Sequence, residues 1–350
     1  MISKKQQSNI TLIEFSYLRG FGIFLVVLGH SFPYIKDINT PIYNYIHSLI
    51  YSFHMPLFFM ISGFFANKLF KIKSLKDFKS FILSKFKKLL IPYFIISTLT
   101  IPIKLILNKF SERPLVLSET IKDILFFPWN NPIIFFWFIY VLFFMFLFAP
   151  VLIKINKYLV LTILLAMSIL TIDNIEFLAI STILKYYIFF FIGLYIYPVY
   201  MNYRNKILNI NLKQYRNILF ILIPLILFLL NFNIDYNSLN VFYKYLTNIL
   251  FILKSLLGIY VSFIICILLY KFRHIKLVSN TFDTLNKYSF DIYLLSWFPQ
   301  IFTRILLLQL LNLNYNLVVI ISFLIGFSPI IVSKFILRKS NILKKFILGI

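Results

Sequence analysis

The sequence predicts an all-α integral membrane protein with about ten transmembrane helices and both termini in the cytoplasm. Of the 350 residues, 61% are hydrophobic and only 13% are charged, and the mean hydropathy is +0.88. A soluble domain is roughly half apolar and about a quarter charged. A water-facing globule of this size cannot bury so much apolar surface, so the composition excludes a soluble enzyme.

Ten apolar stretches approach the length of about 20 residues that a helix needs to cross a bilayer core. In order they are 13–32, 44–66, 86–107, 132–153, 158–172, 177–199, 216–232, 247–270, 285–311 and 315–337. Several contain proline, which membrane helices tolerate because neighbouring groups satisfy the freed carbonyls. Strands of a membrane barrel would be shorter and alternating in hydrophobicity. The intervening segments are too short for a soluble domain, so we expect one transmembrane domain over 1–350.

Positive charges gather in alternate loops. Most of the 35 Lys and Arg residues lie at the two ends of the chain and after the second, fourth, sixth and eighth stretches. Cytoplasmic loops of membrane proteins are enriched in Lys and Arg, so this bias places both termini inside the cell. It also accounts for the net charge of +24 without a nucleic-acid partner. We expect a multi-pass protein of the bacterial cytoplasmic membrane.

The sequence offers little for a bound cofactor. A single cysteine, Cys266, excludes a disulfide scaffold and a cysteine-rich metal centre. Four histidines and eleven acids leave few ligands for a metal cage. A Walker loop, a dinucleotide fingerprint and a Ser-His-Asp triad in a recognisable context are absent from the sequence. We therefore expect no metal and no permanently bound cofactor.

Arg19 and His30 are the ionisable pair of the first stretch. An ionisable side chain inside a bilayer costs ~2.5–3.5 kcal/mol or more and is a functional candidate by default. Their separation corresponds to three helical turns plus about 20°, which places both on one face, ~16 Å apart along the axis. Glycines beside each would allow a helix or ligand to approach. The alternative is that the two side chains snorkel to opposite headgroup layers.

The other polar residues of the apolar stretches can each be explained by a structural role. His54, in the second stretch, is a candidate for the same site, or else a buried neutral histidine bonded to a backbone carbonyl. His47 is interpreted as an interfacial residue and His274 as a solvated loop residue. Arg304, whose long stem can reach water, is interpreted as structural.

Short motifs, in chain order, resemble those of the membrane acyltransferase-3 family, which includes fucose-4-O-acetylase-like and polysaccharide O-acetyltransferase members. The motifs are Leu18-Arg19-Gly20 with His30-Ser31, Phe53-His54-Met55-Pro56, Lys87-Lys88 with Pro92-Tyr93, Trp137-Phe138, 189–193 and 288–295. The resemblance covers about residues 14 to 300. Two positions depart from it, since Glu14 stands where many members have Asp and Ser296 stands where many have His.

The resemblance implies O-acylation, usually acetylation, of sugar hydroxyls in surface polysaccharides or their lipid-linked precursors. Acetyl-CoA would be the cytoplasmic donor, with a succinyl or longer acyl group as the alternative. The family's catalytic Arg and His carry over onto Arg19 and His30. Arg19 would lie at the donor entrance, and His30 would act as a general base or would carry a transient acyl group.

Donor binding involves further candidates. Lys85, Lys87 and Lys88 would attract a polyanionic donor, and Glu14 and His54 are tentative additions. Glu14 lies about 140° around the helix from Arg19, so the two are not expected to pair within that helix. An exporter or flippase of sugar polymers from the same superfamily remains the alternative function. A scaffold role is a third option, against which the shared face of Arg19 and His30 argues.

Overall fold

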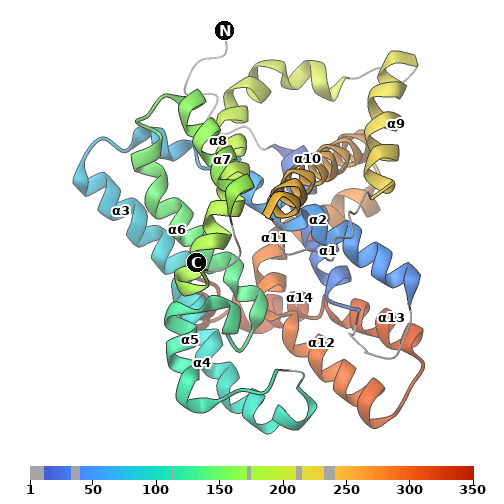
Figure 1. The fold of residues 1–350 in the computed structure, drawn as a ribbon. Helices are drawn as coiled ribbons and strands as arrows, with labels where there is room; N and C mark the ends of the chain where they lie inside the picture. Colours follow the sequence, from blue (N-terminus) through green and yellow to red (C-terminus); the bar gives the residue numbers. More distant parts are fainter. Residues whose placement is uncertain (1–11, 33–39, 112, 172–174, 210–214, 232–240) are drawn as a thin grey trace.

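The computed structural model describes residues 12–32, 40–111, 113–171, 175–209, 215–231 and 241–350, and within these ranges every regular element is helical (Figure 1). The helices are α1 (Ile13–Gly29), α2 (Pro41–Phe64), α3 (Leu75–Lys85), α4 (Ile91–Ile106), α5 (Leu117–Phe126), α6 (Trp137–Leu152), α7 (Lys157–Leu170), α8 (Ile180–Leu208), α9 (Tyr215–Leu229), α10 (Val241–Lys271), α11 (Lys276–Leu295), α12 (Trp297–Arg304), α13 (Tyr315–Ile325), α14 (Pro329–Val332) and α15 (Asn341–Ile347). The predicted all-helical class is confirmed.

Six helical segments of the described chain are long and apolar enough to cross a membrane. They are Pro41–Lys71, Leu75–Ile106, Ile134–Leu152, Phe177–Leu208, Phe242–Lys271 and Tyr315–Leu337. The first, fifth and seventh predicted stretches form the shorter helices α1, α7 and α9, of 17, 14 and 15 residues. The ninth is divided among α11, α12 and a π-helical turn, Ile305–Leu310. Membrane spans for these four stretches, and the orientation of the termini, stay predictions; residues 1–11 lie outside the described chain.

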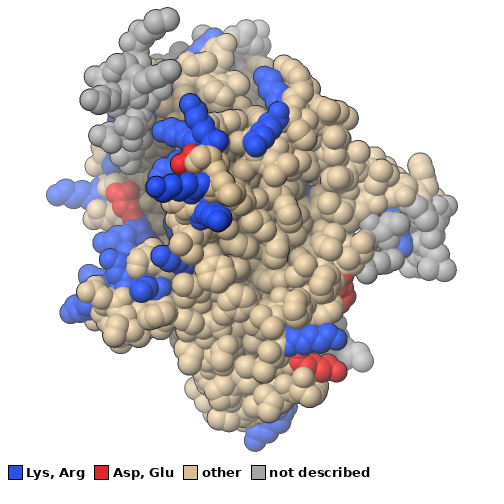
Figure 2. Space-filling view, turned by 90° about the vertical axis from the view of Figure 1, so that its left-hand side faces the viewer, with Lys and Arg blue, Asp and Glu red and all other residues tan. Residues whose placement is uncertain are grey.

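The third predicted stretch has an amphipathic helix in front of it. Ser74 and Asp77 form a reciprocal capping box that starts α3, with Ser74 Oγ accepting from Asp77 N at 3.1 Å and the Asp77 carboxylate accepting from Ser74 N at 3.0 Å. A π-helical turn, Phe86–Leu90, then joins α3 to α4. Figure 2 shows the side of the molecule that lies at the left in Figure 1, and on this side Lys and Arg side chains gather over the upper part, whereas the lower part carries few.

Helices α2 and α8 approach each other through two glycines. A Cβ atom at Gly63 would lie 1.8 Å from the carbonyl oxygen of Phe190, and one at Gly193 would lie 2.0 Å from that of Met60. Small residues allow such backbone contact between membrane helices. α1 packs against the same unit, touching α2, α10 and α11.

We expect Gly63→Ala to destabilise the protein more than Gly22→Ala. The added methyl group at Gly63 meets backbone, which cannot rotate away, whereas at Gly22 it meets the ring of Phe58 at 2.9 Å. Overpacking costs about 1–3 kcal/mol, and a clash with backbone belongs at or above the upper end. Thermal melting of the two purified variants in one detergent checks the order. Equal melting temperatures would show that α2 and α8 are not packed as described.

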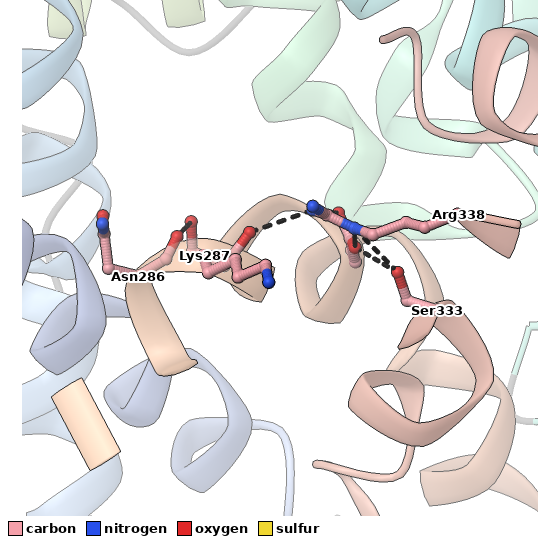
Figure 3. A network of polar contacts seen from close by, with 6 residues as sticks. Asn286, Lys287, Ser333 and Arg338 are labelled. Atoms are coloured by element: carbon pink, nitrogen blue, oxygen red, sulfur yellow. Dashed lines mark hydrogen bonds and ion pairs between the residues drawn. The ribbon is translucent and has the colours of Figure 1, made fainter. Parts of the chain in front are cut away.

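The C-terminal segment fixes α11 through a partly buried ion pair (Figure 3). Arg338 Nε donates to Asp291 Oδ2 at 2.9 Å, and the same carboxylate oxygen accepts a short hydrogen bond from Ser333. Arg338 also donates to the carbonyl of Lys287 at 3.0 Å. These bonds hold the start of the buried half of α11, where Ser289 lines the cavity described next and Asn286 contacts Arg19.

Candidate active site

A cavity of about 610 Å³ has both predicted residues of α1 in its wall: Arg19 near the start of the helix and His30 at its C-cap. Because each helical residue advances 1.5 Å, the cavity extends over ~16 Å along α1. Its middle is apolar, with Ile23, Val26 and Phe58 among the lining side chains. Arg19 and His30, which the sequence places on one face of the helix, therefore line one cavity.

The Arg19 end of the cavity is positively charged. Lys85 and Lys88 line it together with Arg19, and among the described residues its wall contains no Asp or Glu. Arg19 donates to Asn286 Oδ1 at 3.5 Å and lies 5.3 Å from the centroid of the Phe65 ring. Neutral partners leave the charge of the guanidinium uncompensated by protein acids. This end suits a polyanion.

Glu14 and Lys87, two of the expected donor-binding residues, lie outside the set that lines the cavity. Glu14 is fully buried and accepts hydrogen bonds from Arg204 at 2.6 and 3.0 Å and from Tyr200 at 2.6 Å. It thus joins α1 to α8, and both oxygens of its carboxylate are engaged by these contacts. Lys87 is solvent-exposed. The structure gives Glu14 a structural position and leaves only Lys85 and Lys88 of the lysine cluster at the cavity.

Aromatic rings surround the His30 end. The imidazole of His30 stacks on Phe135 with 4.6 Å between centroids, and its Nδ1 is buried with no hydrogen-bond partner in the described part of the chain. Tyr51 stands between the two histidines, 6.4 Å from the His30 ring and 4.8 Å from that of His54. His54 Nδ1 lies 2.8 Å from the carbonyl of Ile50, which can only accept, so Nδ1 carries the proton. His54 therefore makes the backbone hydrogen bond expected of a buried neutral histidine, and it also lines the cavity.

The ninth stretch contributes polar residues that the sequence analysis did not select. Trp297, Gln300 and Arg304 line the cavity at i, i+3 and i+7 spacing, the signature of one helical face. Gln300 Nε2 donates to the Val27 carbonyl at 2.9 Å and to Ser31 Oγ at 3.1 Å, which ties α12 to the end of α1. The helical spacing of these three residues can be seen in the sequence, but the sequence does not show that their common face lines a cavity. Ser296, at the departure from the family motif, is buried outside the cavity wall.

Comparison with known proteins agrees with the motifs. A family model described as an acyltransferase domain matches residues 12–337, which include every lining residue named above. No curated protein and no solved structure matches the chain. In the described ranges no group of three or more His, Cys, Asp or Glu side chains could hold a metal ion. The resemblance noted in the sequence is thus confirmed over almost the whole chain, which belongs to the acyltransferase-3 family.

Proposed function

We propose that this membrane acyltransferase moves an acetyl group from cytoplasmic acetyl-CoA to a sugar hydroxyl of a surface polysaccharide or its lipid-linked precursor. The observation that carries the proposal is the single cavity, which has three cations, Arg19, Lys85 and Lys88, at one end. At its other end it has three histidines, His30, His47 and His54, together with Arg304. Such a cavity matches a donor whose phosphates are far from its reactive thioester. It also separates the charged part of the donor from the place of reaction.

The charges of the cavity favour one orientation of the donor. Its phosphates lie with Arg19, Lys85 and Lys88, because charge-assisted hydrogen bonds to phosphate are among the strongest that side chains make. The long, mostly uncharged arm then follows the apolar middle of the cavity. The thioester reaches the histidine end, where Phe135 and Tyr51 limit the space around the imidazole.

His30 is the group placed for proton transfer. The acceptor hydroxyl attacks the thioester carbonyl while the imidazole takes its proton. The tetrahedral intermediate then collapses, the C–S bond breaks, and the departing thiolate takes the proton from the imidazolium. The products are the sugar ester and coenzyme A. A transient acyl-His30 is the second route, in which the imidazole itself attacks and the hydroxyl then displaces the acyl group.

Cells with and without the gene test this function. Mild alkali releases ester-linked acetyl groups from the purified glycan, and NMR counts them. Loss of base-labile acetyl signals with the gene supports the transferase. Unchanged ester content, with polymer retained inside the cells, would overturn it in favour of the exporter.

Arg19→Ala is expected to raise the KM for acetyl-CoA about 10- to 100-fold. A charge-assisted hydrogen bond contributes about 1.5–3 kcal/mol, and each 1.4 kcal/mol is tenfold in affinity. Arg273→Ala is the matched control, because Arg273 is an exposed loop residue over the ring of Tyr270. Initial rates of radiolabelled acetyl transfer in membranes give both values. A KM within twofold of wild type for Arg19→Ala would remove the guanidinium from the donor site.

A further inference from the structure

A second hollow, of about 1140 Å³, adjoins the cavity of the proposed transferase. The end of α4, the segment after it, α5 and α12 contribute to its wall. Six residues line both spaces: His47, Tyr51, Trp129, Ile134, Trp297 and Arg304. Because the walls are shared at the histidine end, a molecule in the second hollow can meet one in the first beside His30.

The second hollow differs in chemistry from the cationic end of the first. Its wall contains two carboxylates, Glu119 and Asp123, and three cations, Lys104, Arg113 and the shared Arg304. It also contains three side-chain amides, Asn130, Asn131 and Gln309. Carboxylates accept and amides both donate and accept hydrogen bonds. A wall of mixed charge and amides matches a ligand rich in hydroxyl groups, which both donate and accept, better than it matches a polyanion.

The aromatic residues at the junction are held in place. Trp129 stacks on Trp137 with 4.7 Å between centroids, and its Nε1 donates to Thr182 at 2.8 Å. His47 stacks on Tyr51 at 3.8 Å. Rigid rings beside polar groups are the usual lining of a site that fixes the orientation of a small ligand, and ring faces pack against the C–H surface of a sugar.

The second hollow also lies away from the donor end. α4 begins next to Lys88 and ends close to Lys104, a length of about 24 Å for its 16 residues. Figure 1 shows α3, at the cationic end, in the upper part of the molecule and α5 in the lower part. The two substrates would therefore bind at opposite ends and would not compete.

We propose that the second hollow is the acceptor site and binds a saccharide, with Asp123 and Asn130 as hydrogen-bonding groups and Trp129 and Trp297 as ring contacts. The proposal rests on the proposed function for its assignment as an acceptor site. Asp123 is half-buried and lies near the side-chain amide of exposed Asn130. A sugar hydroxyl pair can bridge such a carboxylate and amide. Arg304, at the junction, then lies beside the hydroxyl that reacts.

The test is a binding measurement that does not require turnover. The probe is the base-deacetylated oligosaccharide repeat cut from the surface polysaccharide of the producing cells. Its binding to the purified full chain in detergent is followed by tryptophan fluorescence, since two of the three tryptophans line the second hollow. Asp123→Asn is compared with Asp283→Asn, an exposed aspartate of α11 outside both walls.

We expect wild type and Asp283→Asn to bind the probe alike, and Asp123→Asn to bind it about tenfold more weakly, the loss expected for one charge-assisted hydrogen bond. Coenzyme A should bind all three alike and should not displace the oligosaccharide. Equal saccharide affinity in Asp123→Asn, absence of saccharide binding to wild type, or displacement by coenzyme A would each overturn the acceptor site. Saccharide binding with the expected dependence, but without acetyl transfer in cells, would overturn the proposed function and leave the saccharide site standing.

Discussion

His30→Ala is expected to lower acetyl transfer by about 10²- to 10⁴-fold while the protein still inserts and accumulates. That range is what a positioned general acid–base group contributes to a rate. His30 is the histidine that stacks on Phe135 at the end of the donor cavity, and its Nδ1 has no hydrogen-bond partner among the described residues. The measurement is radiolabelled acetyl transfer to endogenous glycan in membranes, normalised to the amount of protein.

Two further substitutions separate chemistry from packing. His274→Ala, in an exposed loop, should transfer acetyl groups at the wild-type rate. His30→Phe restores a ring against Phe135 but supplies no base, so it should be as inactive as His30→Ala. Wild-type transfer by either His30 variant would refute the assignment, whichever of the two chemical routes operates.

Glu14→Ala is expected to destabilise the fold by about 3–5 kcal/mol. The substitution leaves the Arg204 guanidinium, whose side chain is 18% exposed, without its carboxylate, and it removes the acceptor of Tyr200. Breaking a buried ion pair by removing one partner has a cost of this size. The measurement is thermal melting of the purified protein in detergent.

Glu14→Asp and the double variant Glu14→Ala with Arg204→Met make the prediction specific. Aspartate keeps the charge, so it should lose less stability than alanine. Replacing both partners removes the uncompensated charge, so the double variant should recover part of the loss. The folded fraction of the Glu14→Ala protein should bind coenzyme A with unchanged affinity. A stable Glu14→Ala protein that no longer binds coenzyme A would return Glu14 to the donor site.

The sequence determined the features that depend on neighbours along the chain. Apolar length and the low share of charged residues determined the helical class. Helical periodicity placed Arg19 and His30 on one face, because a fixed rotation per residue needs no tertiary information. The same arithmetic was available for Trp297, Gln300 and Arg304, but a long cationic stem near a helix end also fits snorkelling.

Only the tertiary structure decided which distant residues meet. Glu14 finds Arg204 and Tyr200 on α8, far along the chain, so no local pattern separates it from a donor ligand. Gly63 and Gly193 are required because the backbones of α2 and α8 are in contact at these positions. The second hollow is assembled from separate segments between residues 47 and 309, none of which is unusual alone. Burial and pairing between remote segments depend on how helices pack, and packing is a property of the whole chain rather than of any stretch of it.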